Sequence, residues 1–165
     1  MRRRSFVTAA FAAAALPGLA RAQATPAPAP TAPPPQPIQP QNALEYSFVA
    51  ALTNAAMRPV FRRQLLESHL ALALASADAD APPREIAIGE GVQAGLVFTS
   101  AARLESVLGP EAPRVILTGR AALERLRGKN VVVNARLVPM LTLEPDDVAH
   151  YLETPVSPAS AGPTQ

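Results

Sequence analysis

The sequence predicts an α/β fold, with α+β as the alternative, in which helices pack on one small mixed β-sheet. Strand-like apolar runs are interspersed with segments of helical periodicity between residues 42 and 153. This stretch is long enough to bury a single modest core. The chain of 165 residues contains no Cys, so disulfides and thiolate metal sites are excluded. One folded domain is therefore expected.

Two helices are expected at the start of this domain. Asn42 can cap the first helix, and Glu45 occupies the capping-box position three residues later. Pro59 suits the first turn of a second helix that buries Phe61, Leu65 and Leu66. The apolar residues of the first helix recur at helical spacing and are expected to face the core: Leu44, Phe48, Ala51, Leu52 and Ala55.

The middle of the domain combines strands with two strand–helix units. Residues 69–75 alternate Leu with Ala, which predicts a strand, and residues 84–89 predict a second. Residues 96–108 and 115–126 then each read as a strand followed by a helix, with Ser100 as the cap of the first helix. The two units have similar sequences because each needs residues suited to a strand, a helix cap and a helix.

Two further strands and a helix complete the predicted domain. The strands are expected at residues 131–133 and 137–143. The helix begins at Glu144 and Pro145, and its first acids complement the helix dipole. Its inward side chains are expected to be Val148, Tyr151 and Leu152.

Residues 1–22 have the three parts of a secretory signal. Three arginines precede an uncharged apolar run at 6–16, and Ala20 and Ala22 provide the small residues for cleavage before Gln23. The apolar run is shorter than the roughly 20 residues that span a bilayer. The mature chain is therefore expected to have no permanent membrane span, and a retained signal anchor is the alternative.

The arginines indicate the export route. Arg3, Arg4 and Phe6 resemble the twin-arginine consensus, and an ordinary Sec signal is the alternative. The expected partners are the export machinery and signal peptidase, and the expected location is periplasmic or secreted. Loss of the four arginines in residues 1–22 changes the formal net charge from +2 to −2. Binding to nucleic acid, which needs clustered positive charge, is not expected.

Proline-rich segments flank the predicted domain. Residues 23–41 favour extended polyproline II and are interpreted as a linker, or alternatively as a ligand for an aromatic groove. Residues 154–165 are interpreted as a disordered tail.

The domain resembles the SseB family, named for an enhanced-serine-sensitivity phenotype, over residues 44–153. The matching pieces keep their order and spacing: Pro59 and Phe61, Leu65 to Glu67, Val97 to Ser100, Arg103 and Leu104, Leu108 to Pro110, Gly119 and Arg120, Val132 to Asn134, and Leu143 to Leu152. The resemblance implies a small α/β N-terminal domain and no established reaction, cofactor or catalytic residue.

This sequence departs from the family pattern in three respects. Many members continue into a C-terminal domain, and no such domain is expected within these 165 residues. Ala135 and Arg136 replace the usual Pro-Gly after the Asn of the late strand, so a different turn is expected. Export is not a property that the family leads one to expect.

Several polar residues are candidates for chemistry. Asp146, Asp147 and His150 can share one helix face, which suits a metal pair or an acid–base couple, or simply a solvated face. Arg120 lies at a helix start, where positive charge is unfavourable, and is a candidate for binding a partner's carboxylate or phosphate. Ser100 fits a helix cap better than a nucleophile, and His69 fits a surface histidine. The glycine-rich segment 89–95 fits a hairpin, and no cofactor or resident metal is predicted.

The leading functional hypothesis is a non-catalytic domain that binds a protein or an envelope component. Whether the protein is an enzyme stays open. One alternative is a hydrolase-like enzyme that uses Asp146, Asp147 and His150. Another is a chaperone-like helper of a second exported protein.

Overall fold

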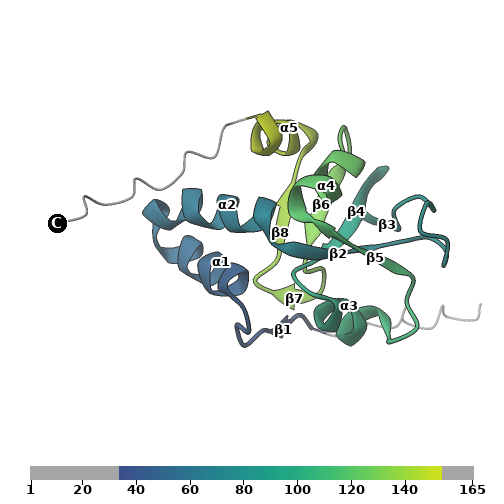
Figure 1. Cartoon of the computed structure of the whole chain (residues 1–165), viewed down its shortest axis with the longest axis horizontal. Coiled ribbons are helices and arrows are strands. Elements are labelled where there is room, and N and C mark those ends of the chain that lie inside the picture. Colours follow the sequence, from purple (N-terminus) through teal and green to yellow (C-terminus); the bar gives the residue numbers. More distant parts are fainter. Residues whose placement is uncertain (1–33, 154–165) are drawn as a thin grey trace, which may run out of the picture. The chain divides into compact units, whose positions relative to one another are not determined.

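The computed structural model describes residues 34–153 (Figure 1). The helices of this part are α1 (Ala43–Thr53), α2 (Arg58–Glu67), α3 (Ala101–Leu108), α4 (Gly119–Arg125) and α5 (Pro145–Glu153), with a short 3₁₀ turn, η1 (Ala55–Met57), before α2. The strands are β1 (Gln36–Pro37), β2 (His69–Ala73), β3 (Glu85–Gly89), β4 (Val92–Phe98), β5 (Arg114–Thr118), β6 (Asn130–Val133), β7 (Leu137–Val138) and β8 (Leu141–Leu143).

The main sheet is mixed, which confirms the predicted fold class. Its strand order is β5-β2-β4-β6-β8, and β3 pairs with the first half of β4. β4 and β6 are parallel, and the other pairs of this sheet are antiparallel. The carboxyl ends of β4 and β6 therefore lie side by side at one end of the sheet.

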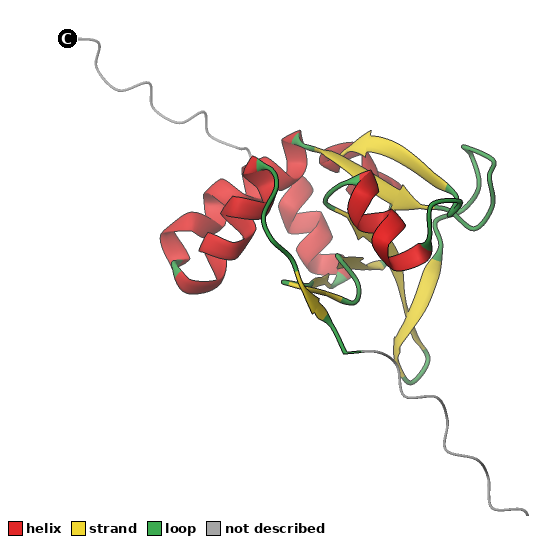
Figure 2. Cartoon of the chain, turned by 90° about the horizontal axis from the view of Figure 1, so that it is seen from below, coloured by secondary structure: helices red, strands yellow, loops and turns green. Residues whose placement is uncertain are grey.

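Helices cover both faces of the sheet. One face carries the leucines of β2, packed against buried side chains from α1, α2, α4 and α5. The opposite face carries Ala71 and Ala73, packed against Leu104 of α3. In Figure 1, α3 lies below β2 and β5, whereas α4 and α5 lie above them, and Figure 2 shows the chain from the side of α3. The predicted alternation of Leu and Ala in β2 is thus confirmed, because each residue type faces its own side.

The prediction that Leu52 and Ala55 face the core is wrong. Leu52 is 59% exposed, and Ala55 lies in exposed η1. Phe61 of α2 stacks on Phe48, with ring centroids 4.7 Å apart. The contact with α2 thus occupies the side of α1 that carries Phe48, and the side that carries Leu52 is left exposed.

The segment 137–143 forms two strands where the sequence predicts one. β7 pairs with β1 and β8 pairs with β6, so the two strands belong to different sheets. Pro139 lies between them. Proline has no backbone N–H to donate to a strand ladder, which accounts for the interruption.

The end of the proline-rich stretch lies within the fold. The N–H of Gln36 donates to the carbonyl oxygen of Arg136 at 3.1 Å, and that of Ile38 donates to Val138 at 2.8 Å. Asn134 and Arg136, in the turn that differs from the family pattern, have φ angles of 59° and 65°. Residues 36–38, which the sequence assigns to a linker, therefore dock on β7.

Other predictions fall outside the described residues. These are the signal at residues 1–22, most of the linker and the tail at 154–165. None of the helices between residues 34 and 153 combines the length and the hydropathy that a membrane span requires.

Candidate functional site

The predicted trio on α5 lies on an exposed helix face. Asp146, Asp147 and His150 are all exposed, and Asp147 Oδ2 accepts the N–H of Glu144 at 3.0 Å. Asp147 therefore caps the start of α5. Within residues 34–153, no group of three or more His, Asp and Glu side chains is placed to hold a metal ion. An acid–base role for the trio stays a prediction.

Two arginines reach the carboxyl end of the same helix. Arg62 Nη2 donates to the carbonyl oxygens of His150 and Tyr151, both at 3.2 Å. Arg120 Nη1 donates to the carbonyl oxygen of Leu152 at 3.0 Å. Cations are favourable at the carboxyl end of a helix, where carbonyl groups lack partners. This contact gives Arg120 a structural task, and its binding to a partner stays a prediction.

A buried charged network is the feature that the sequence analysis missed. Glu45 in the first turn of α1 is 0% exposed. Its Oε1 accepts from the Thr99 hydroxyl at 2.7 Å and from Arg103 Nε at 3.0 Å. Its Oε2 accepts from the Gln41 N–H at 2.8 Å and from Arg103 Nη2 at 2.9 Å. The carboxylate therefore joins α1 to the end of β4, to α3 and to the chain before α1.

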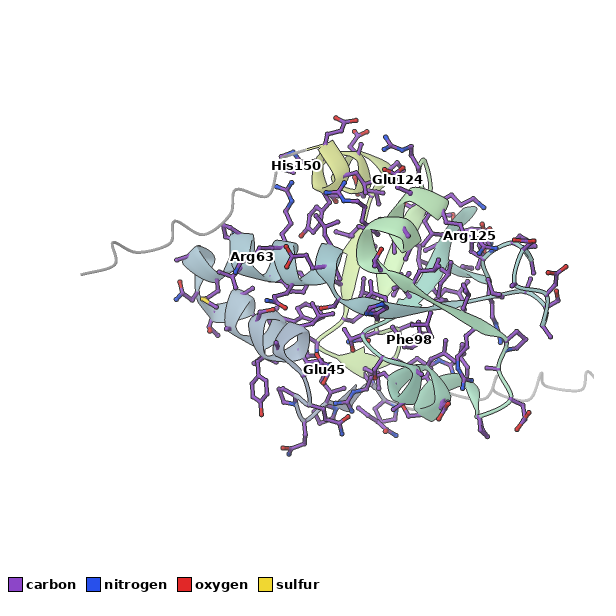
Figure 3. The ribbon with its side chains drawn as sticks, in the orientation of Figure 1. Glu45, Arg63, Phe98, Glu124, Arg125 and His150 are labelled. Carbon is purple, nitrogen blue, oxygen red and sulfur yellow. The ribbon has the colours of Figure 1, made fainter. Side chains whose placement is uncertain are left out.

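The fold explains why these side chains meet. Thr99 follows β4, and Asn134 follows the parallel strand β6, so both lie at the same end of the sheet. Asn134 Oδ1 accepts the N–H of Thr99 at 3.0 Å. Arg103 lies in the first turn of α3, the helix that follows β4. It also donates to the carbonyl oxygen of Gln39. Figure 3 places Glu45 near this end of the sheet and His150 well away from it, on α5.

The network keeps Glu45 ionised. Burial by itself raises the pKa of Glu45, but hydrogen bonds from Arg103, Thr99 and the Gln41 backbone outweigh it and lower the pKa. Each carboxylate oxygen already accepts two hydrogen bonds, so the group is poorly placed to take a proton from a substrate. Its geometry is that of a structural clamp.

An open pocket adjoins this network. It measures about 420 Å³, and its lining combines the starts of α1 and α3 with the start of β2: Asn42, Ala43, Leu44, Ser68, His69, Thr99 and Ser100. Two residues that the sequence singled out separately, His69 and Ser100, thus share one pocket. Asn42 Oδ1 accepts from the Glu45 N–H and Ser100 Oγ from the Arg103 N–H, which confirms both predicted caps. The side chains of Asn42 and Ser100 thus both serve as helix caps at the rim of this pocket.

The outer side of α1 exposes an apolar surface, which we call the α1 face: Tyr46, Val49 and Leu52. Their exposed fractions are 63%, 38% and 59%. The spacing of three residues places them along one side of the helix. Glu45 is the only charged residue of α1 and is buried, so the helix presents no charge to solvent. The α1 face is therefore a candidate interaction surface.

The fold and these sites define a small α/β domain with helices on both faces of a mixed sheet. The chain belongs to the SseB family, because the family model described as SseB protein N-terminal domain matches residues 44–150, more than half of its length. The predicted resemblance is thereby confirmed. No curated protein and no solved structure gives a significant match to the chain.

Proposed function

We propose that the protein is an exported, non-catalytic module that binds a protein or envelope component through the α1 face. The observation that carries this proposal is the exposure of Tyr46, Val49 and Leu52 on a helix without exposed charge. Fully burying a large apolar side chain is worth about 1.5–3 kcal/mol. A partner that covers the three side chains would gain a substantial part of its affinity there.

Export is proposed from the sequence pattern. Arg3, Arg4 and Phe6 resemble a twin-arginine signal, and Ala20 and Ala22 suit cleavage by signal peptidase. The twin-arginine route carries folded proteins, so the domain would reach the periplasm or the exterior with its α1 face already formed.

The binding proposal is tested by capturing partners with the immobilised chain from Gln23 onward. An envelope fraction supplies the candidates, and the readout is the apparent affinity of each captured component. Leu52→Glu places a charge in the α1 face and is expected to weaken capture at least about tenfold, equivalent to 1.4 kcal/mol. Val92→Glu is the matched control, because Val92 is 41% exposed on β4 and lies outside the α1 face.

Three outcomes would count against this function. One is the absence of any specific partner, and another is equal capture by the Leu52→Glu and Val92→Glu variants. The third is turnover of a general hydrolase substrate that disappears in a folded His150→Ala variant, which would favour the enzyme alternative. A captured exported protein that folds only in the presence of this domain would favour the chaperone-like alternative.

A further inference from the structure

Strand β5 forms one edge of the main sheet. It pairs on one side with β2, from His69 opposite Thr118 to Ala73 opposite Arg114. Among the described residues no strand pairs with its other side. Figure 1 shows β5 beside β2, with α4 following directly from its end.

The register shows which backbone groups of β5 point away from the sheet. The Gly119 N–H donates to Ser68 at 2.8 Å, and the Leu74 N–H donates to Pro113 at 2.9 Å. Hydrogen-bonded and non-hydrogen-bonded pairs alternate in an antiparallel ladder. The backbone N–H and C=O groups of Val115 and Leu117 therefore bond to β2. Arg114 and Ile116 direct both their N–H and their C=O groups outward. Thr118 directs its N–H outward, but its C=O begins α4, of which Thr118 is the N-cap.

This edge lacks the features that usually protect an edge strand. Such edges commonly carry charges, prolines or bulges, or are very short. The opposite edge, β8, has only three residues. β5 has five residues, and its last four are uncharged and mostly β-branched. Ile116 at its centre is 47% exposed. The charge of Arg114 is engaged by Glu105 of its own α3.

We propose that β5 pairs antiparallel with β5 of a second copy of this chain, around a two-fold axis at Ile116. In this register Ile116 lies opposite the second copy's Ile116, and Arg114 lies opposite its Thr118. The N–H and C=O of each Ile116 then bond to those of the other, and each Thr118 N–H donates to the C=O of the second copy's Arg114, so the interface is isologous. The two main sheets become one continuous sheet.

Charge and packing support pairing with a second copy. Each Arg114 meets an uncharged Thr118 and keeps its own Glu105, so no like charges face each other. Ile116 pairs with Ala71, which belongs to the cluster on the α3 side of the sheet. The two Ile116 side chains therefore meet on that side and cover apolar surface that is exposed in the single chain. This interface is independent of the α1 face.

The proposal is tested on the chain from Gln23 onward by sedimentation over a range of concentrations and by amide hydrogen exchange. A dimer is expected, with the amides of Ile116 and Thr118 becoming protected as it forms. The amides of Val115 and Leu117 bond to β2 and should be protected at every concentration. A monomer at all concentrations, with the amides of Ile116 and Thr118 unprotected, would overturn the proposal.

Two substitutions at one position sharpen the test. Ile116→Pro removes an outward N–H without removing a bond to β2, and Ile116→Lys adds a charge at the two-fold axis. Each should raise the dimer dissociation constant at least about tenfold. Ile88→Lys is the control, since Ile88 is 40% exposed on β3 and should leave the dimer intact. A dimer that survives both Ile116 variants, or that Ile88→Lys disrupts equally, would contradict pairing through β5.

Discussion

Replacing Gly119 with Ala is expected to lower the free energy of unfolding by about 3 kcal/mol or more. A Cβ atom at this position would lie 1.7 Å from the carbonyl oxygen of Leu65 and 2.7 Å from its carbonyl carbon. Both are backbone atoms of α2 and cannot rotate away. The Gly119 N–H also donates to Ser68 at 2.8 Å, which fixes the close approach of α4 to the end of α2. Urea unfolding followed by circular dichroism measures the loss.

Gly128→Ala is the matched control for this prediction. Gly128 has a φ of +78° and open space around its Cα, so its replacement strains the backbone without a clash. A non-glycine residue in the left-handed region costs about 1–2 kcal/mol. The loss in Gly119→Ala should clearly exceed that in Gly128→Ala. Equal losses would show that the contact between α4 and α2 is not as tight as described.

Removing the Glu45 carboxylate is expected to destabilise the domain by about 3–5 kcal/mol. Glu45→Ala leaves Arg103, whose side chain is only 14% exposed, without its carboxylate partner. It also removes the acceptor of the Gln41 N–H and the nearer of two acceptors of the Thr99 hydroxyl, the other being Asn134 Oδ1. The double variant Glu45→Leu with Arg103→Met should recover part of the loss, because replacing both charges costs less than leaving one buried. Chemical unfolding of the single and double variants measures both effects.

The exposed pair Glu124 and Arg127 is the control for the buried pair. Both side chains are about half exposed, so Glu124→Ala should change stability little. An effect of Glu45→Ala as small as that of Glu124→Ala would contradict a structural role for the network.

The Glu45 network also sets a pH dependence. Because the pKa of Glu45 is lowered in the folded protein, its contribution is fully present above the pKa of an unfolded glutamate. It is lost as pH falls through the folded pKa. The stability difference between the wild type and Glu45→Gln should therefore be largest at neutral pH and shrink on acidification. A difference that stays constant down to acidic pH would contradict this assignment.

Structural features that depend on residues close together in the sequence are predicted best. Asn42 and Ser100 cap helices as expected, and the Leu and Ala residues of β2 face opposite sides, because these features follow from local spacing. The prediction failed at Leu52, whose exposure depends on where α2 packs. It also failed at residues 137–143, where the two halves find different partner strands.

The candidate site also depends on contacts between residues far apart in the sequence. The capping-box pattern drew attention to Glu45, but its main partner Arg103 lies 58 residues away and no local pattern connects them. Arg62 and Arg120 come from different helices and meet at the end of α5 only because the helices pack on one face of the sheet. The face shared by Asp146, Asp147 and His150 could be predicted, since it follows from helical spacing.

The N-terminus of the protein as it occurs in its own cells tests the central claim of an exported binding module most directly. Intact-mass analysis of the periplasmic and external fractions should find a chain that begins at Gln23. Replacing Arg3 and Arg4 with Lys should retain the precursor in the cytosol. Recovery of the unprocessed chain, still beginning at Met1, from the cytosol of otherwise unaltered cells would contradict the claim.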